Sequence, residues 1–346
     1  MSHETIDVLI ADDSGFMQLL IKSILSVDQN IKVIATANNG KEAYELTRTH
    51  RPKVVVMDMM MPKYDGLYGV EQIMKNCPTS ILMLSAIGHT DINPIMNSLK
   101  LGAIDYLNKP QGSLSKLRSI DSEIVKKVKL AASINVNEMD VATRSQPKNE
   151  SAVESSQVEA IIIGASTGGP RALESVLKAL PEKLKVPVVV AQHMPSNFIT
   201  SFTDRLNNIL PQRVRVADIG MFLEPGIIYI APGDKNIALE RKGKSKVKVA
   251  LDEKVYPEYN HPSVNSVMMS AAKVYGNKTL GVILTGMGED GARGMTDIYR
   301  VGGITIAQDR ESSVVFGMPQ KAIQSGCIKK IMPLDAIGNN IKNHLL

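Results

Sequence analysis

Aromatic residues are scarce in this chain of 346 residues, and tryptophan is absent. Phe and Tyr together make up 4% of the sequence. This scarcity argues against a sugar-binding cleft or a base-stacking surface, because both need flat rings. The sequence also has no run of about eighteen apolar residues, the length that a membrane helix needs, and no basic start followed by an apolar stretch. We therefore expect a cytoplasmic protein that does not insert into membranes.

Cysteine is nearly absent as well, since only Cys77 and Cys327 occur. Neither has a second Cys or a His at metal-ligand spacing, so the sequence favours a reducing compartment and no cysteine metal site. Hydrophobic residues make up 44% and charged residues 22%, which excludes wholesale disorder and a rod-like fold. The net charge of +5 arises in the C-terminal part. It is mild for a nucleic-acid-binding protein and would suit a substrate with negative charge.

The length and the pattern of apolar runs predict two α/β domains. Between residues 5 and 130, five short apolar runs alternate with amphipathic helical patterns, which is typical of a doubly wound, flavodoxin-like parallel sheet. The polar composition of residues 132–157 predicts a linker. A second doubly wound, Rossmann-like α/β pattern follows, with a β-hairpin around 236–250 whose basic tip is a solvated turn. The predicted domains are thus 1–131 and 158–346.

Polar side chains follow the ends of four strands predicted in the first domain. They are Asp12, Asp13, Asp58, Ser85 and Lys109. Because the carboxyl ends of parallel strands meet at one edge of a sheet, we expect these groups to lie together. Three adjacent carboxylates repel each other unless a hard cation such as Mg²⁺ binds between them. A carboxylate beside such an ion, a hydroxyl and a lysine is suited to accept a phosphoryl group.

Residues 5–130 resemble the receiver domain of two-component response regulators. The motifs that carry the resemblance are Asp12-Asp13-Ser14, Met57-Asp58-Met59-Met60-Met61-Pro62, Asp65-Gly66, Ser85-Ala86 and Lys109-Pro110. The resemblance implies that Asp58 is the phosphoacceptor. It implies further roles: Mg²⁺ binding by Asp12, Asp13, Asp58 and the Met60 carbonyl, phosphoryl binding by Ser85 and Lys109, and an aromatic switch at Tyr106.

The second domain contains a candidate nucleophile, Ser166. Residues 164–168 fit G-x-S-x-G, a strand-to-helix turn that exposes a serine oxygen, although a plain glycine-rich turn fits the same pattern. A nucleophilic serine needs a base. Two of the six histidines lie at suitable places, His193 and His261. We expect His193 to be the base because it ends the next predicted strand, and we keep His261 as the second choice.

The third member of such a triad is a carboxylate that orients the imidazole. Asp290 follows a strand in the glycine-rich segment Leu284-Thr-Gly-Met-Gly-Glu-Asp290 and is our candidate. It could instead be the N-cap of the helix that follows. Asp234 and Asp309 also follow strands, and spacing does not exclude them. The chain order Ser, His, Asp differs from the α/β-hydrolase order Ser, Asp, His, which disfavours that fold.

The whole chain resembles the chemotaxis response regulators that are protein-glutamate methylesterases. In the second domain the matching motifs are Gly164-Ala-Ser-Thr-Gly-Gly-Pro170, Ala191-Gln-His-Met-Pro195, Ala231-Pro-Gly-Asp234, His261-Pro-Ser-Val264, Leu284-Thr-Gly-Met-Gly-Glu-Asp-Gly291, Ala307-Gln-Asp309 and Gly317-Met-Pro319. The resemblance implies Ser166 as nucleophile, His193 as base, Asp290 as its partner, and the Met287 N–H in the oxyanion hole. It implies no cofactor for the esterase chemistry.

The same resemblance implies a function and partners. The enzyme would remove methyl esters from glutamates of methyl-accepting chemoreceptors and would deamidate glutamines, and a chemotaxis histidine kinase would donate the phosphoryl group. The unphosphorylated receiver would cover the active site. One alternative is a receiver-controlled serine hydrolase for another ester. Another is a DNA-binding regulator, but that requires a helix-turn-helix or a strongly basic helix, and the C-terminal part shows a second α/β sheet instead.

Overall fold

The computed structural model describes residues 5–85, 92–109, 114–136, 158–243, 245–258 and 261–345, without the side chains of Ser85 and of 114–122. The chain forms two compact units, Met1–Asp140 and Val141–Leu346, which we describe separately. Of the linker predicted over 132–157, residues 137–157 lie outside the described residues. Among the described helices, none is both long enough and apolar enough to cross a membrane.

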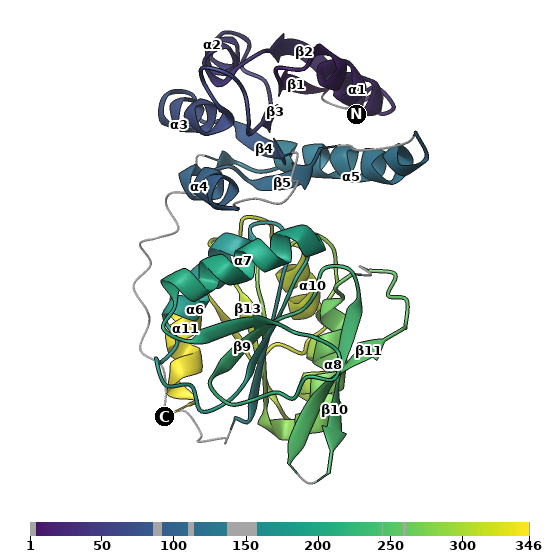
Figure 1. The fold of residues 1–346 in the computed structure, drawn as a ribbon, viewed down its shortest axis with the longest axis vertical. Helices are drawn as coiled ribbons and strands as arrows, with labels where there is room; N and C mark the ends of the chain where they lie inside the picture. Colours follow the sequence, from purple (N-terminus) through teal and green to yellow (C-terminus); the bar gives the residue numbers. More distant parts are fainter. Residues whose placement is uncertain are drawn as a thin grey trace. The chain divides into compact units, whose positions relative to one another are not determined.

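The first unit is a five-stranded parallel sheet in the order β2-β1-β3-β4-β5 (Figure 1). Its strands are β1 Ile6–Ala11, β2 Ile31–Ala37, β3 Val54–Asp58, β4 Ser80–Ser85 and β5 Asp105–Asn108. Its helices are α1 Gly15–Leu25, α2 Gly40–His50, α3 Gly66–Asn76, α4 Asn93–Leu101 and α5 Leu114–Ala132. Helices α1 and α5 pack together, and α3 packs against both α2 and α4, so both faces of the sheet are covered.

Burial on both faces explains why the sequences of the central strands of this unit are largely continuous apolar runs. All five residues of β3 are buried, for example, including Asp58 at its end. The helices start at residues that satisfy their first N–H groups: Ser14, Asn39 and Asp65 accept hydrogen bonds at the starts of α1, α2 and α3. The predicted flavodoxin-like α/β sheet is confirmed.

The second unit is a seven-stranded parallel sheet in the order β14-β13-β12-β6-β7-β9-β8, with a separate antiparallel hairpin β10-β11. Its strands are β6 Ala160–Ala165, β7 Val188–Gln192, β8 Arg213–Val216, β9 Ile227–Ile230, β10 Asn236–Lys242, β11 Lys246–Asp252, β12 Thr279–Ile283, β13 Ile304–Gln308 and β14 Lys330–Met332. Its helices are α6 Gly169–Lys178, α7 Ser196–Ile209, α8 Val264–Tyr275, α9 Ala292–Arg300, α10 Met318–Gln324 and α11 Leu334–Asn343, with a 3₁₀ turn η3 at Gly276–Lys278.

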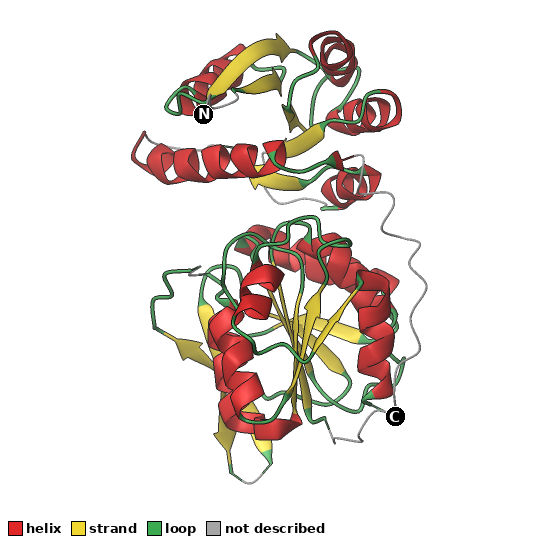
Figure 2. Ribbon diagram, turned by 180° about the vertical axis from the view of Figure 1, so that it is seen from behind, coloured by secondary structure: helices red, strands yellow, loops and turns green. Residues whose placement is uncertain are grey.

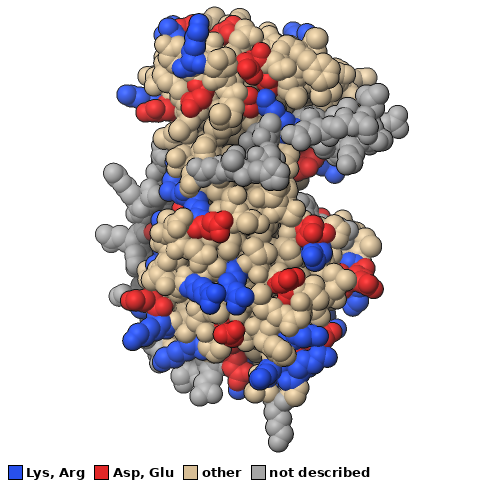
Figure 3. Space-filling view, viewed as in Figure 1, with Lys and Arg blue, Asp and Glu red and all other residues tan. Residues whose placement is uncertain are grey.

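Helices cover this sheet on two sides, as Figure 2 shows. Helix α11 packs on α6, while α9 packs against both α8 and α10, and the hairpin strand β10 lies against α8. The described residues of the hairpin turn are exposed, as predicted for its basic tip. On the face drawn in Figure 3, basic and acidic side chains of the described residues are interspersed.

Two strands of the second unit, β8 and β14, were not predicted. Both are short edge strands that contain charged residues, Arg-Val-Arg-Val in β8 and Lys-Ile-Met in β14. Apolar runs identify strands that are buried on both faces, and an edge strand does not need such a run. The central order β12-β6-β7 places the loops after these three strands side by side at the carboxyl edge.

Candidate active site

The candidate nucleophile Ser166 lies in the tight turn between β6 and α6. Its N–H donates to the carbonyl of Thr285 at 3.0 Å, and its own carbonyl accepts from the N–H of Gly169 at 2.7 Å. Gly168 has φ 75°, a left-handed conformation that L side chains rarely adopt. A Cβ there would also lie 2.6 Å from the Cβ of Val314. The turn therefore requires glycine directly before the helix.

His193 follows β7 and lies between Ser166 and Asp290. Its Nδ1 is 3.0 Å from Ser166 Oγ, and its Nε2 is 2.9 Å from Asp290 Oδ2. The side chain of His193 is only 4% exposed. If the serine hydroxyl donates to Nδ1, the neutral ring must carry its proton on Nε2, where it donates to the carboxylate. The structure thus brings the three predicted triad residues into one hydrogen-bonded chain.

The carboxylate of Asp290 is buried and held at the N-terminus of α8. Oδ2 accepts from the N–H of Val264 at 2.7 Å, and Oδ1 accepts from the N–H groups of Asn265 and Gly291, both at 2.9 Å. Ser263 Oγ donates to the same Oδ1 at 3.2 Å. These donors offset the cost of burying a carboxylate, and the positive end of the helix dipole favours a negative charge there.

The capping role that the sequence suggested for Asp290 is present, but on a different helix. Asp290 caps α8, whereas α9, the next helix in the chain, begins after Gly291. The side-chain oxygen of Asn265 accepts from the N–H groups of Gly291 and Gly294 at the start of α9. Sequence reasoning missed Ser263 and Asn265, although the N-cap pattern Pro-Ser-Val at the start of α8 was a usable signal.

The alternative triad residues lie elsewhere. His261 is exposed in the segment before α8. Asp234 is exposed and lies 4.0 Å from the ammonium of Lys235. Asp309 Oδ1 accepts from the N–H and the hydroxyl of Ser312, at 2.9 and 2.6 Å. Among the candidates that the sequence left open, His193 and Asp290 are therefore the pair that the structure joins to Ser166.

The loop that contains Met287 lies against the Ser166 turn. Gly286 is so close that a Cβ on it would lie 2.7 Å from the Cβ of Ser166. The N–H of Gly286 donates to Val315, and its carbonyl accepts from Gly317 and Met318, which fixes this loop on both sides. Gly286, directly before Met287, is therefore held by hydrogen bonds on both sides and lies beside the Ser166 side chain.

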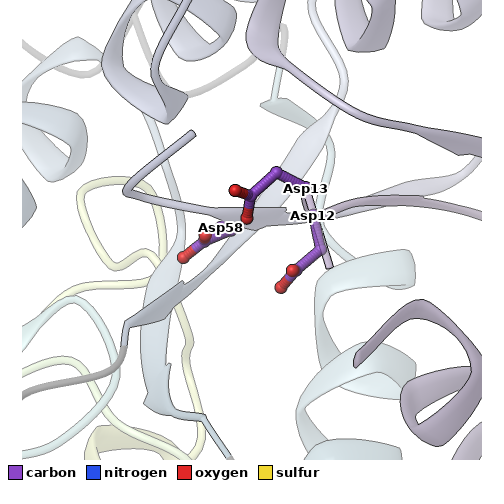
Figure 4. Close-up of side chains that lie close together, drawn as sticks. All are labelled: Asp12, Asp13 and Asp58. Atoms are coloured by element: carbon purple, nitrogen blue, oxygen red, sulfur yellow. The ribbon is translucent and has the colours of Figure 1, made fainter. Parts of the chain in front are cut away.

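The acidic residues predicted in the first unit form a cluster at the ends of β1 and β3 (Figure 4). Carboxylate oxygens of Asp12, Asp13 and Asp58 lie within 4.8 Å of one another. Asp12 and Asp58 are buried, while Asp13 is exposed. The ammonium of Lys109 lies 2.8 Å from Asp12 Oδ2 and 2.8 Å from Asp58 Oδ2. Four of the five predicted groups are thus together.

Burial and the charges of neighbouring groups have opposing effects on the pKa of Asp58 and on that of Lys109. Burial raises the pKa of Asp58 above its ordinary value, and the nearby Lys109 only partly counteracts that effect. Burial alone would lower the pKa of Lys109, but its hydrogen bonds to Asp12 and Asp58 outweigh this and raise the pKa. The buried Oδ1 of Asp58 accepts no hydrogen bond from the described residues. The three carboxylates could hold a divalent cation, because their oxygens lie within 4.8 Å of one another and carboxylate oxygens are the ligands that a hard cation binds.

The other residues predicted for the receiver are Met60, Tyr106 and Ser85. The side chain of Met60 is 74% exposed, directly after β3 and Met59. Tyr106 is buried in β5, where Lys127 donates to its carbonyl at 2.9 Å and lies 5.8 Å from its ring centroid. Ser85 ends β4, but its side chain is outside the described residues. The packing of Tyr106 shows that the aromatic ring faces inward in this structure.

Both parts of the chain match known families. Residues 8–120 match the response regulator receiver domain, and residues 161–341 match the CheB methylesterase. The crystal structure of the Thermotoga maritima CheB methylesterase catalytic domain resembles the second unit with a TM-score of 0.52 and 38% sequence identity. That match covers 54% of this chain and 97% of the crystallised domain.

Relatives that share both parts extend over nearly the whole chain. A protein-glutamate methylesterase/protein-glutamine glutaminase of Pyrococcus abyssi is 36% identical over 99% of this chain and 94% of its own length. A protein of the same name from Desulfitobacterium hafniense is 38% identical, over 97% of this chain and 96% of its own. Because these similarities span both units in the same order, the chain belongs to the CheB methylesterase family, in the form that carries an N-terminal response regulator receiver domain.

Proposed function

We propose that the protein is a phosphorylation-activated protein-glutamate methylesterase that hydrolyses glutamate methyl esters on chemoreceptors and also deamidates glutamines. The observation that carries the proposal is the hydrogen-bonded chain from Ser166 through His193 to the buried Asp290. This arrangement is the one that nucleophilic acyl transfer requires. The names of relatives that align over nearly the full length give the substrate class.

In the proposed reaction, Ser166 Oγ attacks the carbonyl carbon of the ester while Nδ1 of His193 takes the hydroxyl proton. Asp290 stabilises the imidazolium that forms, because its Oδ2 lies 2.9 Å from Nε2. The imidazolium then gives the proton to the departing oxygen, and methanol leaves. Water attacks the acyl-serine with His193 again as base, which releases a glutamate carboxylate and restores Ser166. With a glutamine side chain the departing group is ammonia.

The negative charge on the tetrahedral intermediate needs hydrogen-bond donors in place before the reaction. We assign this role to the backbone N–H of Met287. The support is the contact of the preceding Gly286 with Ser166 and the hydrogen bonds that hold Gly286 to Val315, Gly317 and Met318. A backbone donor fixed in this way needs little reorganisation when charge develops.

Within the receiver domain, proposed as residues 1–131, Asp58 would accept the phosphoryl group. Asp12, Asp13, Asp58 and the Met60 carbonyl would hold Mg²⁺, which when bound would offset the charge of the incoming phosphate. Lys109 and Ser85 would contact the phosphoryl oxygens, and Tyr106 would respond to them. The close carboxylates and the position of Lys109 support these roles. A chemotaxis histidine kinase would be the phosphodonor, in the cytoplasm.

The linker, proposed as residues 132–157, would join this receiver to a catalytic domain of residues 158–346. Methanol release from purified methylated chemoreceptors, with and without a small phosphodonor, tests the proposed function. The wild-type chain should release methanol and should release it faster with the phosphodonor. Release from a small neutral ester but not from the receptors would instead favour a serine hydrolase with another substrate.

The triad is tested in the same assay by substitution. Ser166→Ala should abolish methanol release while leaving the fold intact, because the smaller side chain fits the turn. Loss of a triad member costs on the order of 10³-fold or more in rate. His193→Ala should match this loss, and His261→Ala should be milder because that side chain is exposed. If Ser166→Ala kept more than a few per cent of the activity, the serine would not be the nucleophile.

A further inference from the structure

Gln192 is a buried side chain next to the triad that the proposed mechanism does not use. It is the last residue of β7 and pairs with Ala165, the last residue of β6. The paired register of the two strands ends here, and Ser166 and His193 are the residues that follow. The side chain is 1% exposed, so it lies inside the protein.

The amide of Gln192 links the backbones of the nucleophile and the base. Its Nε2 donates to the carbonyl of Ser166 at 3.0 Å and to the carbonyl of His193 at 3.0 Å. The N–H of His193 adds a further link to Ala165 at 3.0 Å. The two hydrogen bonds from the Gln192 amide continue the links between the strands past the point where the β6-β7 ladder ends. They hold the two turns that set the 3.0 Å distance from His193 Nδ1 to Ser166 Oγ.

Close packing keeps the amide in this orientation. Gly169, at the start of α6, lies so near that a Cβ on it would overlap Oε1 of Gln192. That oxygen has no hydrogen-bond partner among the described residues. The described polar contacts of this side chain are thus the two hydrogen bonds that its NH₂ group donates, and both acceptors are main-chain carbonyls of triad residues.

We infer that Gln192 is a positioning residue for the esterase reaction, which sets the geometry of Ser166 and His193 through their backbones. The inference rests on the proposed roles of these two residues. A displacement of about 1 Å between a nucleophile and its base can cost on the order of 100-fold in rate. Gln192 donates to the two main chains and not to the reacting groups, so its loss should lower kcat and leave KM unchanged.

The same unit contains a matched control, Gln212. It is also buried, at 4% exposure, and its Nε2 donates to two main-chain carbonyls, those of Leu180 and Pro181. Its Oε1 also has no partner among the described residues. Leu180 and Pro181 follow the end of α6 and Gln212 precedes β8, so this amide lies at the amino edge of the sheet, opposite Ser166. Substitution at Gln212 reports the purely structural cost of losing such an amide.

The test compares Gln192→Met with Gln212→Met in the full-length chain. Methionine has nearly the volume of glutamine but cannot donate hydrogen bonds. Both variants should lower the melting temperature by similar amounts. Gln192→Met should lower the kcat of methanol release by about 10-fold or more with an unchanged KM, whereas Gln212→Met should change kcat by less than about twofold. Gln192→Glu should be worse than Gln192→Met, because a carboxylate would face two carbonyl oxygens.

A small fluorophosphonate gives a second readout that does not involve a receptor. Ser166 Oγ forms a bond to phosphorus, fluoride leaves, and His193 takes the hydroxyl proton, so the rate reports the geometry of the catalytic groups without receptor binding. Gln192→Met should slow this labelling by the same factor as kcat. Equal kcat and labelling rates in the two methionine variants would overturn the inference. Labelling of the Ser166→Ala chain at the wild-type rate would instead overturn the assignment of the nucleophile, and the inference with it.

Discussion

At the scale of single residues, Asp290 takes part in two hydrogen-bond systems at once. Its Oδ2 accepts from His193 and from the N–H of Val264, while its Oδ1 accepts from Asn265 and Gly291. The carboxylate therefore orients the base and caps α8. A change that keeps its shape but removes its charge should affect both catalysis and folding.

We predict that Asp290→Asn lowers kcat by about 10⁴-fold, because the amide stabilises the wrong tautomer of His193. It should also destabilise the protein by about 1–3 kcal/mol, since an amide nitrogen would face buried N–H donors. Methanol release and thermal denaturation measure the two effects. Asp309→Asn is the control, because Asp309 contacts Ser312 and lies outside the triad. Equal losses in the two variants would contradict the assignment of Asp290.

In the receiver domain, Asp58 is the proposed acceptor of the phosphoryl group. We predict that Asp58→Asn abolishes Mg²⁺-dependent labelling by a small phosphodonor and the rise in esterase activity that accompanies it. The amide is nearly isosteric but is a poor nucleophile toward phosphorus. Asp65→Asn is the control, because Asp65 caps α3 through the N–H of Tyr68 and does not belong to the acidic cluster. Full labelling of Asp58→Asn would point to Asp13 as the acceptor.

At the scale of elements, α8 is held in place by contacts at its N-terminus and in its first turns. Its N-terminus binds Asp290, and its first turns are tied to the hairpin through Asp252, the last residue of β11. Asp252 Oδ2 accepts from Ser266 Oγ of α8 at 2.6 Å and from the Tyr256 hydroxyl at 2.7 Å. The hairpin therefore supports the helix that positions the triad carboxylate.

This connection predicts a loss of stability in alkaline solution. Burial, followed by the hydrogen bond to Asp252, raises the pKa of Tyr256 from 10.0 to about 12. The folded state thus keeps the phenol proton more tightly than the unfolded state, so this contribution is complete below pH 10.0 and is lost as the pH rises toward about 12. Tyr256→Phe should be less stable at neutral pH and should lose less stability over that range. Denaturant titrations at a series of pH values measure both, and parallel curves for the two proteins would contradict the prediction.

At the scale of the whole molecule, the chain consists of two compact units. We predict that the unphosphorylated receiver inhibits the esterase and that phosphorylation shifts a two-state equilibrium toward the active form. A shift of about 1–3 kcal/mol is the usual size of such a coupling. The polar composition of the segment between the units makes it the natural site for proteolysis.

We predict that cleavage between about 135 and 156 releases a C-terminal fragment more active than the intact unphosphorylated chain and indifferent to a phosphodonor. Methanol release before and after limited proteolysis measures this, and circular dichroism of the fragment checks that it stays folded. A chain in which Asp58 is replaced by Asn should be activated by cleavage to the same level. A folded fragment no more active than the intact chain would leave the receiver as a purely positive activator.

The fold class was predictable because it depends on local patterns. Strands buried on both faces, such as β6 and β3 up to Met57, are nearly continuous apolar runs, and the amphipathic segments between such strands are typical of helices. The edge strands β8 and β14 were not predictable in this way, since their charged residues remain at the surface. Residues directly after central strands, such as Ser166 and Asp58, could be named as candidates because parallel strands bring their carboxyl ends to one edge.

The sequence ranked the triad candidates but did not exclude the alternatives, and the tertiary structure decided between them. His193 rather than His261 contacts Ser166, because β6 and β7 are neighbours in the sheet. Asp290 rather than Asp234 or Asp309 contacts His193, because β12 lies beside β6 and the start of α8 meets the loop after β12. The hydrogen bonds from Gln192 to the backbones of Ser166 and His193 are likewise determined by the tertiary structure. Such contacts join residues distant in the chain, and their geometry depends on strand order and side-chain direction, which no local pattern encodes.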